Sequence, residues 1–291
     1  MSASIWRTGR FEIDLARPRV MGIVNVTPDS FSDGAVDFTP VRAIARCEQL
    51  LKDGADILDI GGESSRPGAV QVSAEIELER VRPVLAAAVG LGCPISIDTT
   101  KPEVMRVALD LGADIVNDIA ALRTPGALAA VASHPNCGVS LMHMRGTPRS
   151  MQSRPDYSDV VDEVASFLGE RIDAAGAAGI GRERIVVDPG IGFGKTPAHN
   201  LELLARQGDL LVLGVPLLVG WSRKSTLARV IGIDAVPVAE RTPVDRAALE
   251  AASIAAMLLA VQRGAAIVRV HDVAAAVAAL AVCQAAKPAI R

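Results

Sequence analysis

The chain has 291 residues, of which 50% are hydrophobic and 22% are charged, and its formal net charge is −3. This composition is typical of a globular protein with a large core, and it offers no bulk positive charge for binding nucleic acid. The N-terminal segment has no apolar stretch of the signal-peptide kind, no charge-free run is long enough to span a membrane, and the four cysteines form no C-x-x-C pair, so we expect a cytoplasmic protein.

The residues before the first long apolar segment predict a small β-hairpin. The stretch "IWRTGRFEIDL" (5–15) alternates apolar and polar side chains around Thr8 and Gly9, where we place the turn. In a barrel protein this hairpin could plug the bottom of the barrel.

Eight short apolar segments then recur along the chain, and most of them end in Gly, Asp, Asn or Ser. Each is nearly continuous in its apolar character, which is expected of parallel strands buried on both faces. They are residues 19–27, 56–62, 94–100, 113–119, 138–144, 184–190, 215–222 and 266–272.

Helical patterns fill most of the intervening segments. Residues 40–55 carry apolar side chains at helical spacing, and residues 73–92 open with Ser73 followed by acidic residues that suit the helix dipole. Residues 101–113 have a proline in the first turn and a glycine near the end. Further helices are expected at 156–180, 250–265 and 272–286.

Strand–helix alternation repeated eight times predicts a (β/α)8 TIM barrel of the α/β class. We expect a single domain over residues 1–291, with its core at about 19–285. The alternative is a doubly wound open sheet, which should show a G-x-G-x-x-G first turn. The first turn here reads "NVTPDSFSDGA" instead.

The stretch "DPGIGFGKT" (188–196) resembles a phosphate-binding loop but lacks one required residue. The pattern G-x-x-x-x-G-K-[ST] needs a glycine at position 189, where this chain has Pro189. Proline has no N–H to offer a phosphate. Nucleotide binding through Lys195 is therefore disfavoured.

Polar side chains follow several of the predicted strands, at the barrel face where active sites of this fold lie. Asp98, Asn117 and Asp188 offer hydrogen-bond acceptors and one amide donor in an otherwise apolar barrel mouth. Buried carboxylates need donors, which a flat polar heterocycle of guanine-like or pterin-like shape would supply. The alternative is that these side chains only cap loops or helix N-termini.

A second set of strand-end residues is cationic. Arg66, Arg269 and His271, together with Asn25, could bind phosphate or pyrophosphate through charge-assisted hydrogen bonds. The alternative is a solvated rim, or ion pairs with Glu63 and Asp272. No metal motif is evident, although carboxylates and an asparagine near pyrophosphate would fit Mg²⁺. No serine lies in a G-x-S-x-G nucleophile pattern.

Seven motifs, in this order, resemble those of the dihydropteroate synthases of folate biosynthesis, over about residues 20 to 280. They are "MGIVNVTPDSFSDGA", "DILDIGGESSRPGA", "SIDTTKPEVMRVALDLGADIVNDI", "LMHMRGTPRSMQ", "DPGIGFGKT", "VGWSRKS" and "VRVHDV". The resemblance implies a (β/α)8 barrel, usually homodimeric. It also implies the condensation of 6-hydroxymethyl-7,8-dihydropterin pyrophosphate with p-aminobenzoate to 7,8-dihydropteroate and pyrophosphate, with Mg²⁺ required.

By motif match, the resemblance also assigns site residues. It implies a pterin pocket lined by Asp98, Asn117, Met142, Asp188, Phe193, Gly220 and Lys224. It implies a pyrophosphate site made by Asn25, Arg66, Arg269 and His271, with Asn25 also near Mg²⁺. The p-aminobenzoate site, where sulfonamides compete in this family, would be bordered by Ser65, Arg66, Pro67, Ser222 and Lys224. The residues expected to take part in catalysis are Lys224, Asp98, Asp188, Arg269 and His271.

Two alternative functions stay open at this point. A methyltetrahydrofolate-dependent corrinoid methyltransferase would share the Asp and Asn pterin set, but it binds no pyrophosphate and would not need "SRKS" plus "RVHD". A non-catalytic pterin- or anion-binding barrel would be expected to lack Arg66 or Lys224, and both are present. Trp221 departs from the family pattern beside the expected p-aminobenzoate site.

Overall fold

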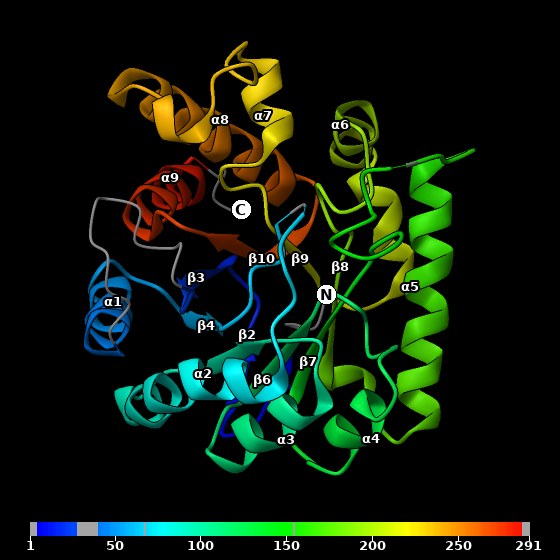
Figure 1. The fold of residues 1–291 in the computed structure, drawn as a ribbon. Helices are drawn as coiled ribbons and strands as arrows, with labels where there is room; N and C mark the ends of the chain where they lie inside the picture. The colour runs from blue at the N-terminus through cyan, green and yellow to red at the C-terminus, as the bar shows by residue number, and fades with distance from the viewer. Residues whose placement is uncertain (1–4, 28–39, 67, 154, 287–291) are drawn as a thin grey trace.

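The computed structural model of the chain describes residues 5–27, 40–66, 68–153 and 155–286. Eight parallel strands close into a barrel in the order β10-β3-β4-β5-β6-β7-β8-β9, and helices surround it (Figure 1). All eight strands predicted from the sequence are present, so the predicted barrel is confirmed and the open sheet is excluded. The strands are β3 (Arg19–Asn25), β4 (Ile57–Gly61), β5 (Ile95–Asp98), β6 (Ile115–Asp118), β7 (Gly138–Met142), β8 (Ile185–Asp188), β9 (Leu217–Val219) and β10 (Ala265–Val270).

Each strand is followed by at least one helix that packs on the outside of the barrel (Figure 1). The helix starts that we predicted have the expected caps: Ser73 Oγ accepts the Ile76 N–H before α2, and Pro102 is the first residue of α3. The helices are α1 (Pro40–Lys52), α2 (Ala74–Ala88), α3 (Pro102–Asp110), α4 (Ala127–Ala132), α5 (Val160–Ala177), α6 (Pro197–Ala205), α7 (Ser225–Val230), α8 (Pro243–Gln262) and α9 (Val273–Ala285). None of these helices is both long and apolar enough to cross a membrane.

The predicted N-terminal hairpin is present, with its turn one residue later than expected. Strands β1 (Ile5–Thr8) and β2 (Phe11–Asp14) pair antiparallel and leave Gly9 and Arg10 as the turn. The Arg10 backbone N–H and guanidinium both donate to the Asp114 carboxylate. A Cβ atom at Gly9 would lie 2.5 Å from Asp114 Oδ1, so this close approach requires glycine.

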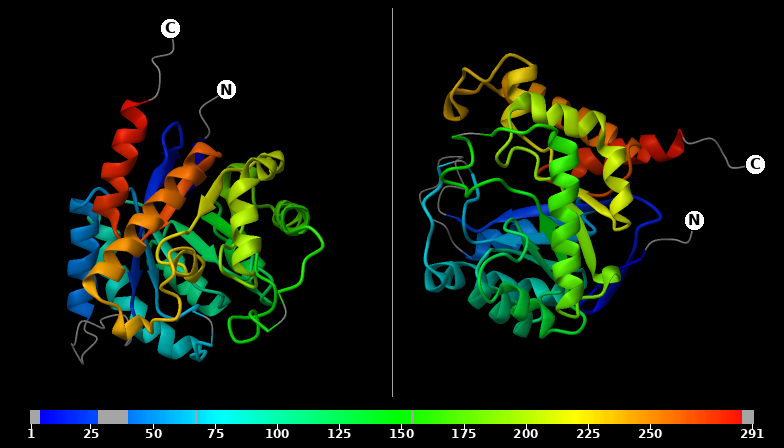
Figure 2. Two further views of the ribbon diagram at one scale, coloured as in Figure 1. Left: turned by 90° about the horizontal axis from the view of Figure 1, so that it is seen from above. Right: turned by 90° about the vertical axis from the view of Figure 1, so that its right-hand side faces the viewer.

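The hairpin closes the N-terminal end of the barrel. Trp6 is fully buried, and its indole N–H donates to the Arg184 carbonyl at 2.9 Å. It packs with Ile13 and Leu15 against the inward side chains near the starts of six barrel strands, which are Met21, Ile57, Ile115, Val186, Leu218 and Ile267. The right panel of Figure 2 shows the hairpin in blue at the end of the molecule opposite the cyan loop that follows β4.

The barrel interior changes from apolar to polar along its axis. Every second residue of a strand points inward. On β4 and β6 the apolar residues that contact the hairpin, Ile57 and Ile115, are followed two positions later by Asp59 and Asn117. Their register partners Ser96 and Ser140 on β5 and β7 complete a polar layer. This polar layer forms the floor of the barrel mouth.

Candidate active site

The three polar residues predicted to hold a heterocycle come together at the carboxyl end of the barrel. Asp98 ends β5 and lies in register with Asn117 on β6, and Asp188 ends β8 in register with Met142. Asn117 is 5% exposed and Asp188 is 7% exposed. The fold therefore places two carboxyl groups and one amide in a mouth that is largely closed to solvent.

Arg269 on β10 links this set to the polar layer below it. Its Nε lies 2.6 Å from Asp59 Oδ2, and its Nη2 lies 2.7 Å from Asp98 Oδ2. Asn117 Nδ2 donates to the same Asp59 oxygen at 3.1 Å. Two of the five N–H donors of a guanidinium are thereby used, and within the described parts of the chain the other three bond to no protein group. The ion pairs considered for Arg269 from the sequence were with Glu63 and Asp272; its partners are Asp59 and Asp98.

Burial sets the protonation tendencies of the two carboxyl groups. Desolvation raises the pKa of Asp98, the Arg269 guanidinium opposes this rise, and the nearby Asp59 adds to it. Desolvation also raises the pKa of Asp188, against the N–H of Gly190, which donates to Asp188 Oδ1 at 2.7 Å. A ligand that donates N–H groups to these two carboxyl groups would stabilise their charged forms.

Lys224 enters the mouth from the N-cap position of α7. Its Nζ lies 4.4 Å from the centre of the Phe193 ring, a cation–π distance. Desolvation lowers the pKa of Lys224 to about 8, with Asp188 and Asp98 acting in the opposite direction and Arg269 in the same one. A Cβ at Gly192 would lie 3.3 Å from Lys224 Cδ, so this glycine leaves room for the lysine side chain.

Apolar side chains form one wall of the same mouth. Met142 is buried with Ile119, Met144 and Met151, and Phe193 packs against this cluster. Gly220 follows β9, and a Cβ there would be 3.9 Å from Arg269. The residues expected to bind pterin thus lie at the carboxyl end of the barrel, where this apolar cluster and the carboxyl groups are found together.

The residues expected to bind an anion lie next to this space. The Ser222 hydroxyl is 2.9 Å from His271 Nδ1 and also accepts the His271 backbone N–H. Arg66 is exposed. Its positive charge, like those of Arg223, Arg269 and Lys224, acts to lower the pKa of His271. Asn25 is half-buried at the end of β3.

One part of the anion prediction is wrong, namely that His271 is a cation. Desolvation lowers its pKa to about 3, and four surrounding cationic side chains add to the effect. The imidazole is therefore neutral at neutral pH. A neutral ring whose Nδ1 accepts from Ser222 carries its proton on Nε2, where it can donate to an anion.

Lys195, the residue that suggested a phosphate loop, has a structural role. It is 2% exposed, and its Nζ donates to the carbonyls of Gly190 (2.9 Å) and Phe193 (3.1 Å) and contacts His143 Nδ1 at 2.8 Å. Desolvation lowers the pKa of Lys195 to about 7. The side chain thus fixes the loop that follows β8 and does not face a ligand.

Some predicted positions do not join the mouth or cannot be placed. Trp221 lies between the inward Gly220 and Ser222, so its ring points outward into the main core, where it is 2% exposed. Ser65 is half-buried in the loop after β4. Pro67 and residues 28–39, which include most of the first expected loop, lie outside the described residues.

The sequence did not reveal the polar layer beneath the mouth. No role is assigned to Asp59, Ser96 or Ser140 from the sequence. Each lies two residues before an inward side chain at the mouth (Gly61, Asp98 and Met142), so alternation along the strand could have found them. In the described part of the chain, Asp59 Oδ1, Ser96 Oγ and Ser140 Oγ have no hydrogen-bond partner.

The donor set suits a metal held mainly by its substrate. Within residues 5–27, 40–66, 68–153 and 155–286, no three His, Cys, Asp or Glu side chains gather as a metal cage. Asn25 offers a single amide oxygen. Mg²⁺ binds through few protein ligands and several water or phosphate oxygens, and this arrangement is compatible with it.

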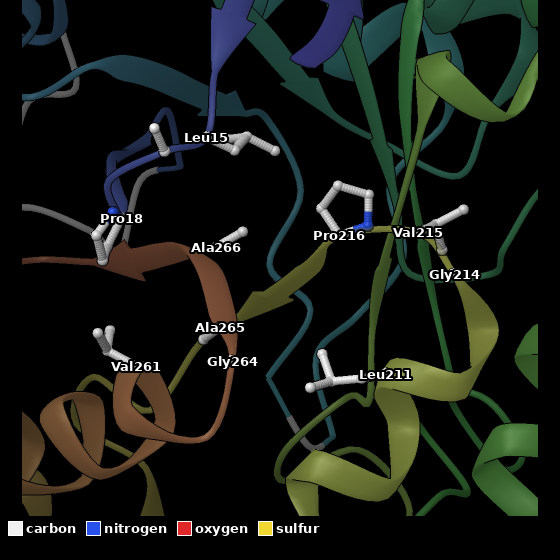
Figure 3. A pocket seen from close by; sticks show the side chains of 11 residues that line it. Leu15, Pro18, Leu211, Gly214, Val215, Pro216, Val261, Gly264, Ala265 and Ala266 are labelled. Carbon is white, nitrogen blue, oxygen red and sulfur yellow. The ribbon is translucent and has the colours of Figure 1, made fainter. Parts of the chain in front are cut away.

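A surface pocket lies elsewhere, at the N-terminal end of the barrel. It has a volume of about 400 Å³ and is lined by residues before β3 and β9 and around the start of β10, among them Leu15, Pro18, Leu211, Pro216 and Val261 (Figure 3). No charged side chain lines it. It has none of the chemistry of the barrel mouth.

Comparison with known proteins identifies the family of the chain. The family described as "Pterin binding enzyme" matches residues 21–271. The dihydropteroate synthase of Neisseria meningitidis serogroup C is 51% identical over 283 residues, which is 96% of each chain. The enzyme of Escherichia coli strain K12 is 45% identical over 274 residues, which is 94% of this chain and 93% of that one.

Solved structures agree with the sequence comparison. The dihydropteroate synthase of Xanthomonas albilineans with 4-aminobenzoic acid has a TM-score of 0.88 and 50% identity, covering 99% of this chain and 100% of that one. The enzyme of Burkholderia cenocepacia complexed with 7,8-dihydropteroate has a TM-score of 0.85 and 47% identity, covering 97% and 96%. The chain belongs to the dihydropteroate synthase family of pterin binding enzymes.

Proposed function

We propose that the chain is a transferase that condenses 6-hydroxymethyl-7,8-dihydropterin pyrophosphate with p-aminobenzoate, giving 7,8-dihydropteroate and pyrophosphate. One observation carries the proposal: Arg269 on β10 lies 2.7 Å from Asp98 of the expected pterin set and two residues before His271 of the expected anion set. The pterin-binding set and the anion-binding set therefore share one mouth, as a pterin pyrophosphate requires.

In the proposed ground state, the chain holds the two halves of this substrate differently. The amino and ring N–H groups of the pterin donate to the buried oxygens of Asp98, Asn117 and Asp188. The Asn117 amide also offers a donor to the edge of the ring. Met142 and Phe193 contact the flat face of the ring. Arg66, His271, Asn25 and the remaining N–H groups of Arg269 bind the pyrophosphate.

The reaction then separates charge along the substrate. As pyrophosphate leaves, negative charge builds on its oxygens and positive charge builds on the pterin methylene group. Fixed hydrogen-bond donors stabilise the negative charge on the pyrophosphate. The carboxylates Asp98 and Asp188 stabilise the positive charge on the methylene group. Both act strongly because they are already oriented in a site with little water. The neutral arylamine forms a C–N bond to the methylene carbon as the C–O bond to pyrophosphate breaks, and the resulting ammonium group loses its proton to solvent. No protein nucleophile is needed.

The p-aminobenzoate is proposed to lie between Lys224 and the loop after β4, next to Ser65, Arg66, Pro67 and Ser222. Lys224 would orient the arylamine over the ring. Sulfonamides, which mimic an aryl amine with an acidic group, are expected to compete with p-aminobenzoate here. Competitive inhibition kinetics would test that expectation.

We further propose that Mg²⁺ acts with the pyrophosphate. Asn25 and the substrate oxygens would hold it, and it would neutralise charge on the leaving group. The observation that supports this is the position of Asn25, which is half-buried at the carboxyl end of β3 and offers an amide oxygen there. Titration with Mg²⁺ in the presence of pyrophosphate and the Asn25→Ala variant would test it.

We also propose a cytoplasmic homodimer. All four cysteines carry free thiols, as a reducing compartment would leave them. Large apolar side chains are exposed on and near α7, α8 and α9, at Val230, Val238, Val244, Leu259 and Val282, and these helices are neighbours in Figure 1. Light scattering would measure the mass directly.

The test of the proposed function is the release of pyrophosphate by purified protein with dihydropterin pyrophosphate and Mg²⁺. We expect release that depends on added p-aminobenzoate. The proposal would be wrong if pyrophosphate were released at the same rate without p-aminobenzoate, or if no pyrophosphate were released. A parallel reaction with methyltetrahydrofolate and a corrinoid acceptor is expected to give no methyl transfer, which separates the methyltransferase alternative.

A further inference from the structure

Buried charges fix the base of the loop between β4 and α2 (residues 62–66 and 68–73, here the β4–α2 loop). Lys101 Nζ lies 2.8 Å from Glu63 Oε2 and 2.5 Å from Glu77 Oε2, so one ammonium group joins the start of the loop to the first turn of α2. Glu77 is fully buried, and the side chains of Lys101 and Glu63 are 18% and 17% exposed. Solvent ions screen such a buried group much less than a surface pair.

The other contacts at this base restrict the path of the chain. Glu63 Oε1 accepts the Val72 N–H at 2.8 Å, which joins the two ends of the loop through one carboxylate. Arg80 Nη1 donates to the Gly62 carbonyl at 2.8 Å. A Cβ at Gly62 would lie 2.7 Å from Val81 Cγ1, so the loop leaves the strand in close contact with α2.

The same loop carries two residues of the proposed p-aminobenzoate site. Ser65 and Arg66 follow directly on the fixed base, and the charge of Arg66 reaches His271 at the mouth. Beyond them the loop turns back, with the Ala69 N–H donating to the Arg66 carbonyl, and it contacts the loop after β7 through Gly68 N–H and the Pro148 carbonyl. A shift at the base would therefore move Ser65 and Arg66 relative to the barrel.

We propose that Lys101 is a positioning residue for p-aminobenzoate binding. Through Glu63 and Glu77 it holds the β4–α2 loop in the form that presents Ser65 and Arg66 to the mouth. Its ammonium group contacts neither of them, so it acts only through the loop. The idea rests on the proposed function, and it assigns a role that the motif comparison did not give to this lysine.

The test compares three variants by steady-state kinetics, by affinity for dihydropterin pyrophosphate, and by hydrogen exchange of the loop amides. Lys101→Met is expected to raise the KM for p-aminobenzoate by about tenfold or more while kcat and pterin affinity change much less. Lys101→Arg keeps the charge and is expected to restore most of the lost affinity. Amides of the β4–α2 loop should exchange faster in Lys101→Met, while those of β10 stay unchanged.

Glu63→Ala covers the case in which Lys101→Met does not fold, because the methionine leaves the buried Glu77 unpaired. This variant frees the loop but retains the pair between Lys101 and Glu77, and it should raise the same KM. Arg10→Gln is the matched control, since Arg10 also pairs with a buried carboxylate, Asp114, at the opposite end of the barrel. It should lower stability without changing the KM.

Two results would overturn the proposal. One is an unchanged loop exchange rate in folded Lys101→Met and Glu63→Ala. The other is an equal loss of kcat, p-aminobenzoate affinity and pterin affinity, which a general loss of structure would give. The exchange measurement does not depend on turnover. If the proposed function is wrong, the unaltered protein shows no reaction that depends on p-aminobenzoate. That outcome is distinct from failure of the proposal for Lys101, which the exchange measurement tests.

Discussion

Arg269 Nε lies 2.6 Å from Asp59 Oδ2, so a guanidinium on β10 is held by a carboxylate on β4 that is fully buried in the barrel. The same arginine reaches Asp98 at the mouth. The pair therefore supports the floor of the site and fixes the direction of a group that we expect to contact pyrophosphate.

Asp59→Asn should lower both stability and activity. The substitution leaves Arg269 beside a neutral amide, and loss of one partner of a buried pair costs about 3 kcal/mol of unfolding free energy. Urea denaturation measures the first effect, and kcat/KM for the pterin substrate measures the second. Asp110→Asn is the control, because Asp110 is 72% exposed and its contact with His134 is a surface pair. Equal effects from both variants would refute a special role for Asp59.

The rate should fall as the pH rises through about 8. Desolvation lowers the pKa of Lys224 to about 8, so its ammonium form, which we expect to be needed, is lost above that pH. Arginine stays protonated throughout this range. In Lys224→Arg the alkaline limb of the kcat/KM profile should therefore move out of the measured range, whatever the absolute rate. An unmoved limb would assign the titration to another group.

His271→Gln should reduce the loss of stability in acid. The pKa of His271 is lowered to about 3, below its unfolded value of roughly 6.5. Between these two values the unfolded chain binds a proton that the folded chain does not, so stability falls as the pH falls through this window. Glutamine does not titrate, so the unfolding free energy should vary less between pH 7 and pH 4. An unchanged slope would contradict the neutral state of His271.

Lys195→Met should destabilise the protein and disturb the loop after β8. Its ammonium group bonds one buried and one partly buried carbonyl oxygen, and leaving a buried group of this kind unsatisfied costs roughly 1–3 kcal/mol. Since that loop carries Phe193, pterin affinity should also fall. Lys52→Met, at an exposed position at the end of α1, is the matched control. A direct phosphate contact would instead weaken pyrophosphate binding with little change in stability.

Local sequence patterns predicted the barrel because each strand is buried on both faces and therefore reads as an apolar run. The same reasoning predicted the strand-end residues, since parallel strands bring their carboxyl ends to one face. Asp98, Asn117 and Asp188 are brought together for this reason. The strands are shorter than predicted at one or both ends, and β3, β5 and β8 end on the polar residues Asn25, Asp98 and Asp188.

Contacts between distant segments could not be read from the same patterns. Arg269 and Asp59 are 210 positions apart, and nothing in either local stretch identifies the other. Glu77 looked like an ordinary acidic residue in the first turn of α2, but it is buried against Lys101. His271 looked cationic because the sequence does not show how far it is buried. Burial and pairing across the barrel decide these cases.

The most direct test of the account is a reaction with isotope-labelled p-aminobenzoate, followed by mass analysis of the product. We expect the label to appear in 7,8-dihydropteroate, with one pyrophosphate released for each molecule formed. Lys224→Met should be folded, as judged by circular dichroism and thermal unfolding, and should lose about a hundredfold or more of the rate. Unlabelled pterin products in the unaltered protein, or near-normal labelling by Lys224→Met, would contradict the account.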